Sequence, residues 1–68
     1  MQHKFIKLSE VRQRTGLSKT YIYQKIKENA FPKQVPLDTR TVRWVEGEID
    51  KWIEEKINQA ANQNNKPE

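Results

Sequence analysis

The chain has 68 residues, no cysteine and one histidine. This length allows a single small domain with a thin core, while the lack of cysteine excludes disulfides and thiolate metal sites, and no apolar run reaches the roughly 20 residues that a membrane span needs. We therefore expect a cytoplasmic protein that is not an enzyme, with no catalytic residues, no metal, no cofactor and no membrane association.

Charge is unevenly distributed along the chain. The net charge is +4, but residues 1–43 carry +7 and residues 44–68 carry −3. A basic body with a separate acidic segment suits a polyanionic partner. The alternative is that the basic residues only solvate the surface of a small protein.

The first predicted elements are a lead-in segment and a short helix. Residues 5–8 predict either a small strand or an extended lead-in. Ser9 is expected to be the N-cap of a helix over residues 10–15, because its hydroxyl can accept from first-turn amides. Gly16 is expected to end this helix in the left-handed conformation.

A second helix is predicted over residues 19–28, with Ser18 as its N-cap. Two short capped helices with a glycine-containing joint of three residues are typical of a helix-turn-helix. With Ile22 at the centre of the inward face, the helical period places Ile26 and Asn29 toward the core.

A β-hairpin, the wing, is predicted over residues 34–44. Residues 34–37 and 41–44 favour strands and flank a short polar loop, and Pro36 restricts its strand to the sheet edge. The large apolar residues nearby are expected to form the core under the wing rather than a platform for stacking bases. These are Phe31, Leu37, Trp44 and Trp52.

A last helix is predicted over residues 46–60. Its apolar stripe has the i, i+3, i+4, i+8 spacing of a buried face, and comprises Ile49, Trp52, Ile53 and Ile57. Residues 58–68 are polar and are expected to fray as a tail, which leaves residues 4–57 as the domain. The fold class expected is mainly α with a small β-hairpin, a single winged helix-turn-helix domain.

The exposed face of the second helix carries groups that read DNA. Thr20, Gln24 and Lys27 fall on one stripe opposite the core, flanked by Lys19 and Tyr23. Glutamine can bond adenine, threonine can touch a thymine methyl or a phosphate, and lysine can contact guanine or phosphate. In a helix-turn-helix this helix lies in the major groove, with its N-terminus toward the DNA. The alternatives are an ordinary solvated face and, for Tyr23, a half-buried core ring.

The wing adds positive charge through Lys33, Arg40 and Arg43. Thr39 and Arg40 lie at its expected tip, where a guanidinium can reach the DNA backbone or an adjacent minor groove. The alternative is that Arg40 is a solvated turn residue. Arg43 alternates in strand phase with Trp44 and is therefore expected to face away from the core.

Seven short segments, in their order and spacing, resemble the AlpA family of prophage regulators. This family belongs to the wider MerR-like winged-helix group that includes phage excisionases, and the resemblance covers roughly residues 5–57. The segments are Leu8-Ser9-Glu10-Val11, Thr15-Gly16-Leu17-Ser18, Ile22-Tyr23, Ile26-Lys27, Phe31-Pro32, Arg43-Trp44 and Glu48-Ile49-Asp50-Lys51-Trp52-Ile53.

The resemblance implies a sequence-specific DNA-binding transcriptional regulator of a prophage or mobile element that acts near an integrase gene. Its partner would be double-stranded DNA, and no cofactor is implied. Carried over by position, the DNA-contacting residues would be Ser18, Lys19, Thr20, Tyr23, Gln24 and Lys27 on the second helix, and Thr39 and Arg40 on the wing.

This sequence departs from the family pattern at two turns. Asn29 stands where the family commonly has glycine, and the wing tip lacks the glycine often found there. The chain also lacks the long dimerisation helix and effector domain of full MerR regulators, so no small-molecule effector is expected. Cooperative self-association on DNA and recruitment of a protein partner both remain open.

Two other functions remain as alternatives. The first is an excisionase-like architectural factor that binds repeated sites, bends DNA and directs recombination. The second is a small adaptor that binds a protein through the same basic face.

Overall fold

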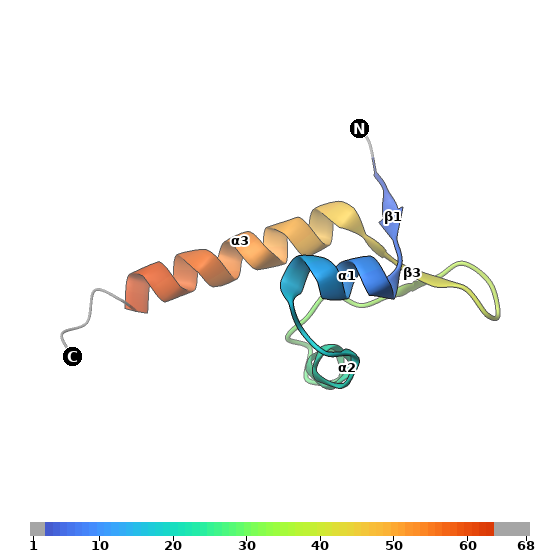
Figure 1. The fold of residues 1–68 in the computed structure, drawn as a ribbon, viewed down its shortest axis with the longest axis horizontal. Helices are drawn as coiled ribbons and strands as arrows, with labels where there is room; N and C mark the ends of the chain where they lie inside the picture. Colours follow the sequence, from blue (N-terminus) through green and yellow to red (C-terminus); the bar gives the residue numbers. More distant parts are fainter. Residues whose placement is uncertain (1–2, 64–68) are drawn as a thin grey trace.

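The computed structural model describes residues 3–63 of the chain. These residues form a small, mostly helical domain with a three-stranded sheet, consistent with a winged helix-turn-helix (Figure 1). The elements in order are β1 (Phe5–Ile6), α1 (Leu8–Thr15), α2 (Lys19–Lys27), β2 (Val35–Pro36), β3 (Val42–Val45) and α3 (Glu46–Gln63).

The sheet is antiparallel, with strand order β1-β3-β2. The lead-in is therefore a true strand, in which Ile6 pairs with Trp44. The predicted hairpin is also present, with Pro36 opposite Val42 on the edge strand β2. An edge strand tolerates proline because its outer side has no neighbouring strand that would need the N–H that proline lacks.

The start of α1 differs from the expectation. The helix begins at Leu8, and the extended N-cap residue is Lys7, whose carbonyl accepts the amides of Glu10 and Val11. Ser9 was thus wrongly predicted as the cap, because the chain turns directly out of β1 and Ser9 is already helical. An N-cap must keep a non-helical backbone.

The start and stop of α2 follow the predicted chemistry. The Ser18 hydroxyl accepts the backbone N–H of Tyr21 at 3.1 Å, which confirms the cap. Regular helix ends at Lys27, one residue before the expected end, and Glu28 is the C-cap. Asn29 takes the left-handed conformation, with φ of 61°. It is exposed rather than core-facing, because the helical period no longer applies beyond the cap.

Most elements of the domain contribute one buried side chain each to the core, and the segment after α2 contributes Phe31. The buried members of the core are Ile6, Val11, Ile22, Phe31, Trp44 and Ile49. Trp44 is fully buried, and its indole N–H donates to the carbonyl of Pro32 at 3.1 Å. Trp52 is half-buried, donates its indole N–H to the carbonyl of Ala30 at 2.9 Å, and meets Phe31 edge to face with ring centroids 4.7 Å apart.

Two residues assigned to the core from sequence are exposed. Leu37 is 46% exposed because it lies beyond β2 on the wing, where nothing packs over it, and Ile57 is 61% exposed. Figure 1 shows why for Ile57: the second half of α3 extends past the rest of the domain, so its stripe has nothing to cover.

The last helix continues to Gln63, three residues beyond its expected end. Residues 58–63, expected to fray, are therefore helical, and residues 64–68 of the predicted tail lie outside the described residues. Extending an existing helix adds a backbone hydrogen bond per residue without needing side-chain burial, and Ala60 and Ala61 favour it. Within residues 3–63, no helix is long and apolar enough to span a bilayer.

Candidate nucleic-acid interface

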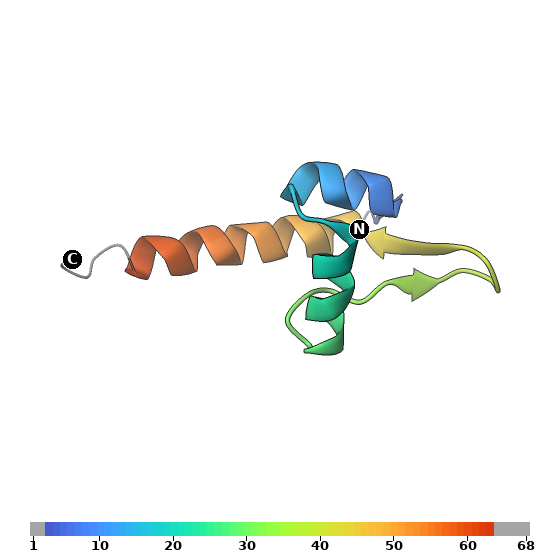
Figure 2. The same ribbon diagram turned by 60° about the horizontal axis from the view of Figure 1, so that its bottom comes forward.

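The outward face of α2 is polar and open. Ile22 is fully buried, while Thr20, Gln24 and Lys27 are exposed on the opposite side of the helix, as the helical period predicts. Ser18 and Lys19 are also exposed at its N-terminus. Figure 2 shows that α2 projects from the body of the domain on the side away from α1, while the hairpin extends from the body in another direction. The six α2-associated candidates thus share one element, although Tyr23 is only half-exposed.

The N-terminus of α2 differs electrostatically from those of the other two helices. Acidic residues occupy the first turn of α1 and of α3, but none lies in the first turn of α2. Within the described residues, the amides of Lys19 and Thr20 donate no hydrogen bond. Unneutralised amides and the positive end of the helix dipole favour an anion such as phosphate at this end.

The aromatic residues of α2 have different surroundings. Tyr23 packs edge to face on Trp44, with ring centroids 6.1 Å apart, so its ring joins α2 to β3. The core interpretation of this ring is therefore correct, and only the exposed part of Tyr23 is open to a ligand. Tyr21 is 42% exposed, and the Lys25 ammonium lies 5.2 Å from its ring centroid.

Glu28, the C-cap of α2, contacts the side chains of Gln24 and Lys25. Its carboxylate accepts the Gln24 amide at 3.4 Å and forms an ion pair of 3.2 Å with Lys25. Both contacts are exposed and therefore exchange easily with water. Gln24 is thus accessible to a base edge without the loss of a buried contact.

The wing tip is closed by a side chain rather than by glycine. Asp38 accepts the backbone N–H of Arg40 at 3.0 Å, and the amide of Leu37 donates to the carbonyl of Thr41 at 2.8 Å. The Arg40 amide first and the Thr41 hydroxyl second hold the pKa of Asp38 below its ordinary value. An aspartate that bonds its own backbone two residues on makes a tight turn without a left-handed residue. The missing glycine is therefore explained.

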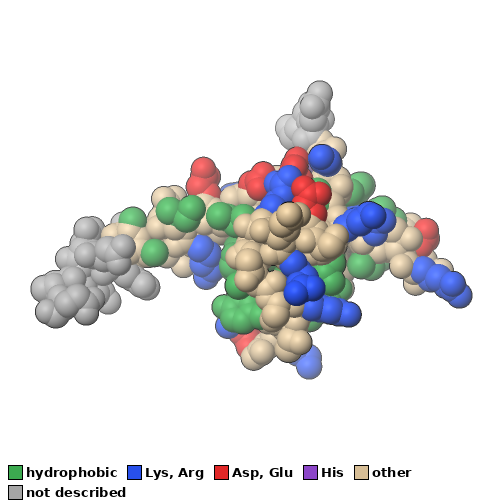
Figure 3. Space-filling model, in the orientation of Figure 1, with side chains coloured by type: hydrophobic (Ala, Val, Ile, Leu, Met, Phe, Trp, Pro, Cys, Tyr) green, Lys and Arg blue, Asp and Glu red, His purple; other side chains and the backbone are tan. Residues whose placement is uncertain are grey.

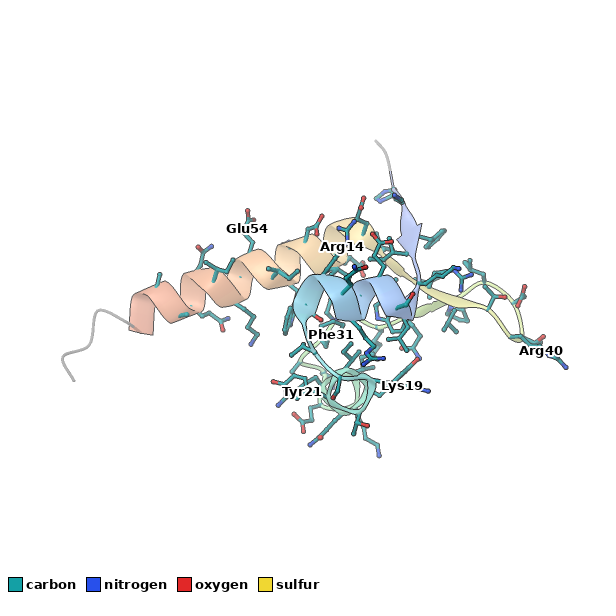
Figure 4. All side chains as sticks on the ribbon, viewed as in Figure 1. Arg14, Lys19, Tyr21, Phe31, Arg40 and Glu54 are labelled. Carbon is teal, nitrogen blue, oxygen red and sulfur yellow. The ribbon has the colours of Figure 1, made fainter. Side chains whose placement is uncertain are left out.

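Thr39 and Arg40 are exposed at this tip, and Figure 4 shows Arg40 at the outer end of the wing, directed away from the domain. Lys19 is directed from α2 toward the side on which the wing lies. Lys33 is exposed in the segment between α2 and β2.

Arg43 is separated from the other candidates. It is half-buried on the sheet face opposite Trp44, as expected, and its guanidinium donates to the carbonyl of Val42 at 2.8 Å. Because Tyr23 packs on the Trp44 side, α2 and Arg43 lie on opposite faces of the sheet. The structure therefore does not bring Arg43 together with the polar stripe of α2.

A cluster of acids neutralises one arginine far from this surface. Arg14 forms ion pairs with Glu10, Glu46 and Asp50 at 2.8, 2.6 and 3.1 Å. Hydrogen bonds to Glu10 and then Glu46 raise its pKa. In Figure 3 the acidic side chains gather mainly where α1 meets the start of α3, whereas basic ones predominate over α2 and the wing. On this face of the molecule the main acidic cluster is thus apart from the main basic region.

Arg12 is a basic residue that sequence reasoning counted in the net charge but did not assign to the site. It lies two positions before Arg14, about 200° around the helix. Since Arg14 is directed to α3, Arg12 projects from the opposite side of α1 and is exposed. The spacing of two residues between Arg12 and Arg14 could have indicated from the sequence that the two side chains lie on opposite sides of α1. Among the described residues, no group of three His, Cys, Asp or Glu side chains is placed to hold a metal ion.

Comparison with known proteins gives the family. Residues 4–57 match the family described as prophage CP4-57 regulatory protein (AlpA). The chain is 36% identical over 56 residues to the protein ORF88 of Enterobacteria phage P4, covering 82% of this chain and 64% of that protein. It is 30% identical over 59 residues to the DNA-binding transcriptional activator AlpA of Escherichia coli (strain K12), covering 78% of this chain and 84% of that one. The family is one of regulators rather than of enzymes. The chain belongs to the AlpA family of prophage regulatory proteins.

Proposed function

We propose that this protein is a sequence-specific DNA-binding transcriptional regulator of a prophage or mobile element, acting near an integrase gene. The observation that carries the proposal is the exposed Thr20-Gln24-Lys27 stripe of α2. It lies opposite a fully buried Ile22, on a helix with no acid in its first turn. The DNA-binding unit spans residues 4–57.

In this proposal α2 lies in the major groove and the wing lies beside it. Gln24 contacts a base edge, and Thr20 contacts a thymine methyl group or a phosphate. Lys19 and the α2 N-terminus, including Ser18, hold the phosphate backbone. Lys27 contacts guanine or phosphate, and the exposed part of Tyr23 borders the same groove.

The wing contributes mainly electrostatic contacts. Arg40, turned outward by the Asp38 turn, contacts the backbone or an adjacent minor groove, with Thr39 beside it. Lys33 adds a further phosphate contact. The acids that pair with Arg14 lie where α1 meets the start of α3, apart from this surface.

The family name and one relative support this assignment from outside the structure. The Escherichia coli relative is named a DNA-binding transcriptional activator, and activation of transcription by this chain is part of the proposal. The chain spans less than two thirds of the phage P4 protein, so nothing is transferred from the whole of that protein.

The test is selection of bound duplexes from a random pool, followed by titration of the selected and a scrambled duplex at two salt concentrations. A short enriched motif bound at least 10³-fold more tightly than the scrambled control, on the order expected for specific sites, supports the proposal. Salt-sensitive binding without a motif would refute sequence specificity and favour the architectural alternative. No binding to any duplex would refute the proposal and favour the protein adaptor.

A further inference from the structure

The outer face of the sheet carries an apolar hollow that the DNA-binding proposal does not use. Strand register places Phe5 beside Val45, and Val35 beside Arg43, on the face opposite Trp44. Phe5 is 48% exposed. Together with the first turns of α3, this face borders a shallow, open hollow of about 780 Å³. Its lining includes Phe5, Val35, Val45, Gly47, Glu48 and Lys51.

The floor of this hollow is open at Gly47. A Cβ atom added there would meet nothing within 4 Å, so none of the side chains of residues 3–63 fills the space next to it. Leu37 follows β2 on the same side as Val35 and is 46% exposed. With Phe5, Val45 and Val35 it forms an apolar strip that runs from the hollow along the wing. Such a strip is larger than the single exposed apolar residues that a surface normally shows.

A second uncovered apolar surface lies at the other end of the domain, on the distal half of α3. Ile57 is 61% exposed, and Ala60 and Ala61 share its side of the helix, by the helical period. Figure 1 shows this half of α3 extending clear of the other elements. Of the exposed large hydrophobics in the described residues, all but Tyr21 belong to these two surfaces.

We propose that the sheet hollow of one copy binds the distal half of α3 of a second copy. The charges beside the two surfaces are complementary. Arg43 and Lys51 outnumber Glu48 at the hollow. On α3, the acidic Glu54 lies about 60° around the helix from Ile57, nearer than the basic Lys56 at about 100°. Figure 4 shows Glu54 directed away from the domain, free to meet a second molecule.

The contact joins two different surfaces, so it does not close into a symmetric pair. Repeated head to tail, it generates an open row of copies. The uncovered apolar groups are few, so the interface falls below the roughly 1,200 Å² of stable complexes and is weak in dilute solution. The contact therefore forms mainly between copies that are already held close together. The inference does not rest on DNA binding, and its test contains no DNA.

The test is disulfide cross-linking, which the chain favours because it has no cysteine of its own. Gly47→Cys places a thiol in the open hollow, and Ala61→Cys places one on the Ile57 side of α3. The two variants are mixed in a buffer of reduced and oxidised glutathione. We expect the mixed dimer to form faster than either homodimer, and a chain that carries both substitutions to form a ladder of oligomers.

Matched variants separate docking from random collision. Gln59→Cys replaces Ala61→Cys with a thiol on the opposite side of the helix, about 200° from Ile57, and should form the mixed dimer several-fold more slowly. Ile57→Glu should reduce mixed-dimer formation about tenfold, because it puts a charge into an apolar contact. Gln59→Glu adds the same charge on the far side and should leave the rate unchanged.

Three results would overturn the proposal: equal rates for the Gln59 and Ala61 thiols, a dominant Ala61→Cys homodimer, or a dominant Gly47→Cys homodimer. A nitroxide on the Ala61→Cys thiol gives a measurement that leaves Gly47 unchanged. Mixed with isotope-labelled chain of unaltered sequence, it should broaden the amide signals of Phe5 and Val45 more than those of Gln24. Uniform or absent broadening contradicts the contact.

Discussion

Replacing Trp44 with alanine should remove most of the stability of this domain. The side chain is fully buried, contacts Tyr23 edge to face and donates to the Pro32 carbonyl. Removal of a buried tryptophan costs about 3–5 kcal/mol, and the lost hydrogen bond adds about 1 kcal/mol. A chain of this size has a total stability of roughly 3–10 kcal/mol. We therefore expect Trp44→Ala to be largely unfolded.

The assay is urea unfolding followed by far-ultraviolet circular dichroism. Leu37→Ala is the control, because sequence reasoning placed Leu37 in the same core and the structure exposes nearly half of it. It should cost less than about 1 kcal/mol. A Trp44→Ala chain that unfolds cooperatively with a loss below about 1 kcal/mol would refute the packing described, since a fully buried tryptophan cannot be deleted so cheaply.

Four further predictions concern the caps and the DNA-binding surface. Gln24→Ala should reduce discrimination between the selected and scrambled duplexes by about 1–3 kcal/mol, with Gln59→Ala on α3 as the unaffected control; equal loss on both duplexes would contradict base reading. Arg40→Ala should weaken both duplexes about equally and lower the salt slope by roughly one, whereas Lys56→Ala, the same loss of charge on α3, should change neither. Ser18→Ala should cost about 1 kcal/mol in thermal unfolding, because the Tyr21 amide loses its acceptor; an unchanged midpoint would contradict the cap. In a pH titration followed by NMR, the Arg40 amide should report a pKa for Asp38 below that of a free aspartate, and an ordinary pKa would contradict the turn. Because folding lowers the pKa of Asp38, its ionised carboxylate stabilises the folded turn at pH values above the pKa of Asp38 in the unfolded chain. This stabilisation is lost as the pH falls through the lower pKa of Asp38 in the folded chain.

Local chemistry explains which parts of the fold could be predicted from sequence. The cap at Ser18 and the left-handed stop at Gly16 depend on single residues and their immediate neighbours. The polar stripe of α2 depends only on the helical period around Ile22. Such features are visible in a sequence because few competing arrangements satisfy them.

The errors came from tertiary context. Ser9 has the chemistry of a cap, but the chain leaves β1 too soon for it to act as one. Ile57 continues the apolar stripe of α3, but it lies on the part of α3 that extends past the rest of the domain, so it is exposed. Arg43 is not one of these errors, since it faces away from the core as expected; its position relative to α2 depends on which sheet face α2 covers, and strand phase does not give that.

The acidic cluster around Arg14 also needed the structure. Its partners Glu46 and Asp50 are more than 30 positions away in the chain, and no local pattern pairs them with α1. Their pairing matters for the candidate interface because it leaves the acids of α3 apart from the basic surface on α2 and the wing.

The central claim is that α2 and the wing tip together form the DNA-binding surface. It is tested most directly by NMR titration of isotope-labelled protein with a duplex that carries one selected motif. We expect the largest amide shifts at Lys19, Thr20 and Arg40, with little change at Glu54 and Ile57 on α3. Largest shifts along α3, with α2 unchanged, would contradict the account.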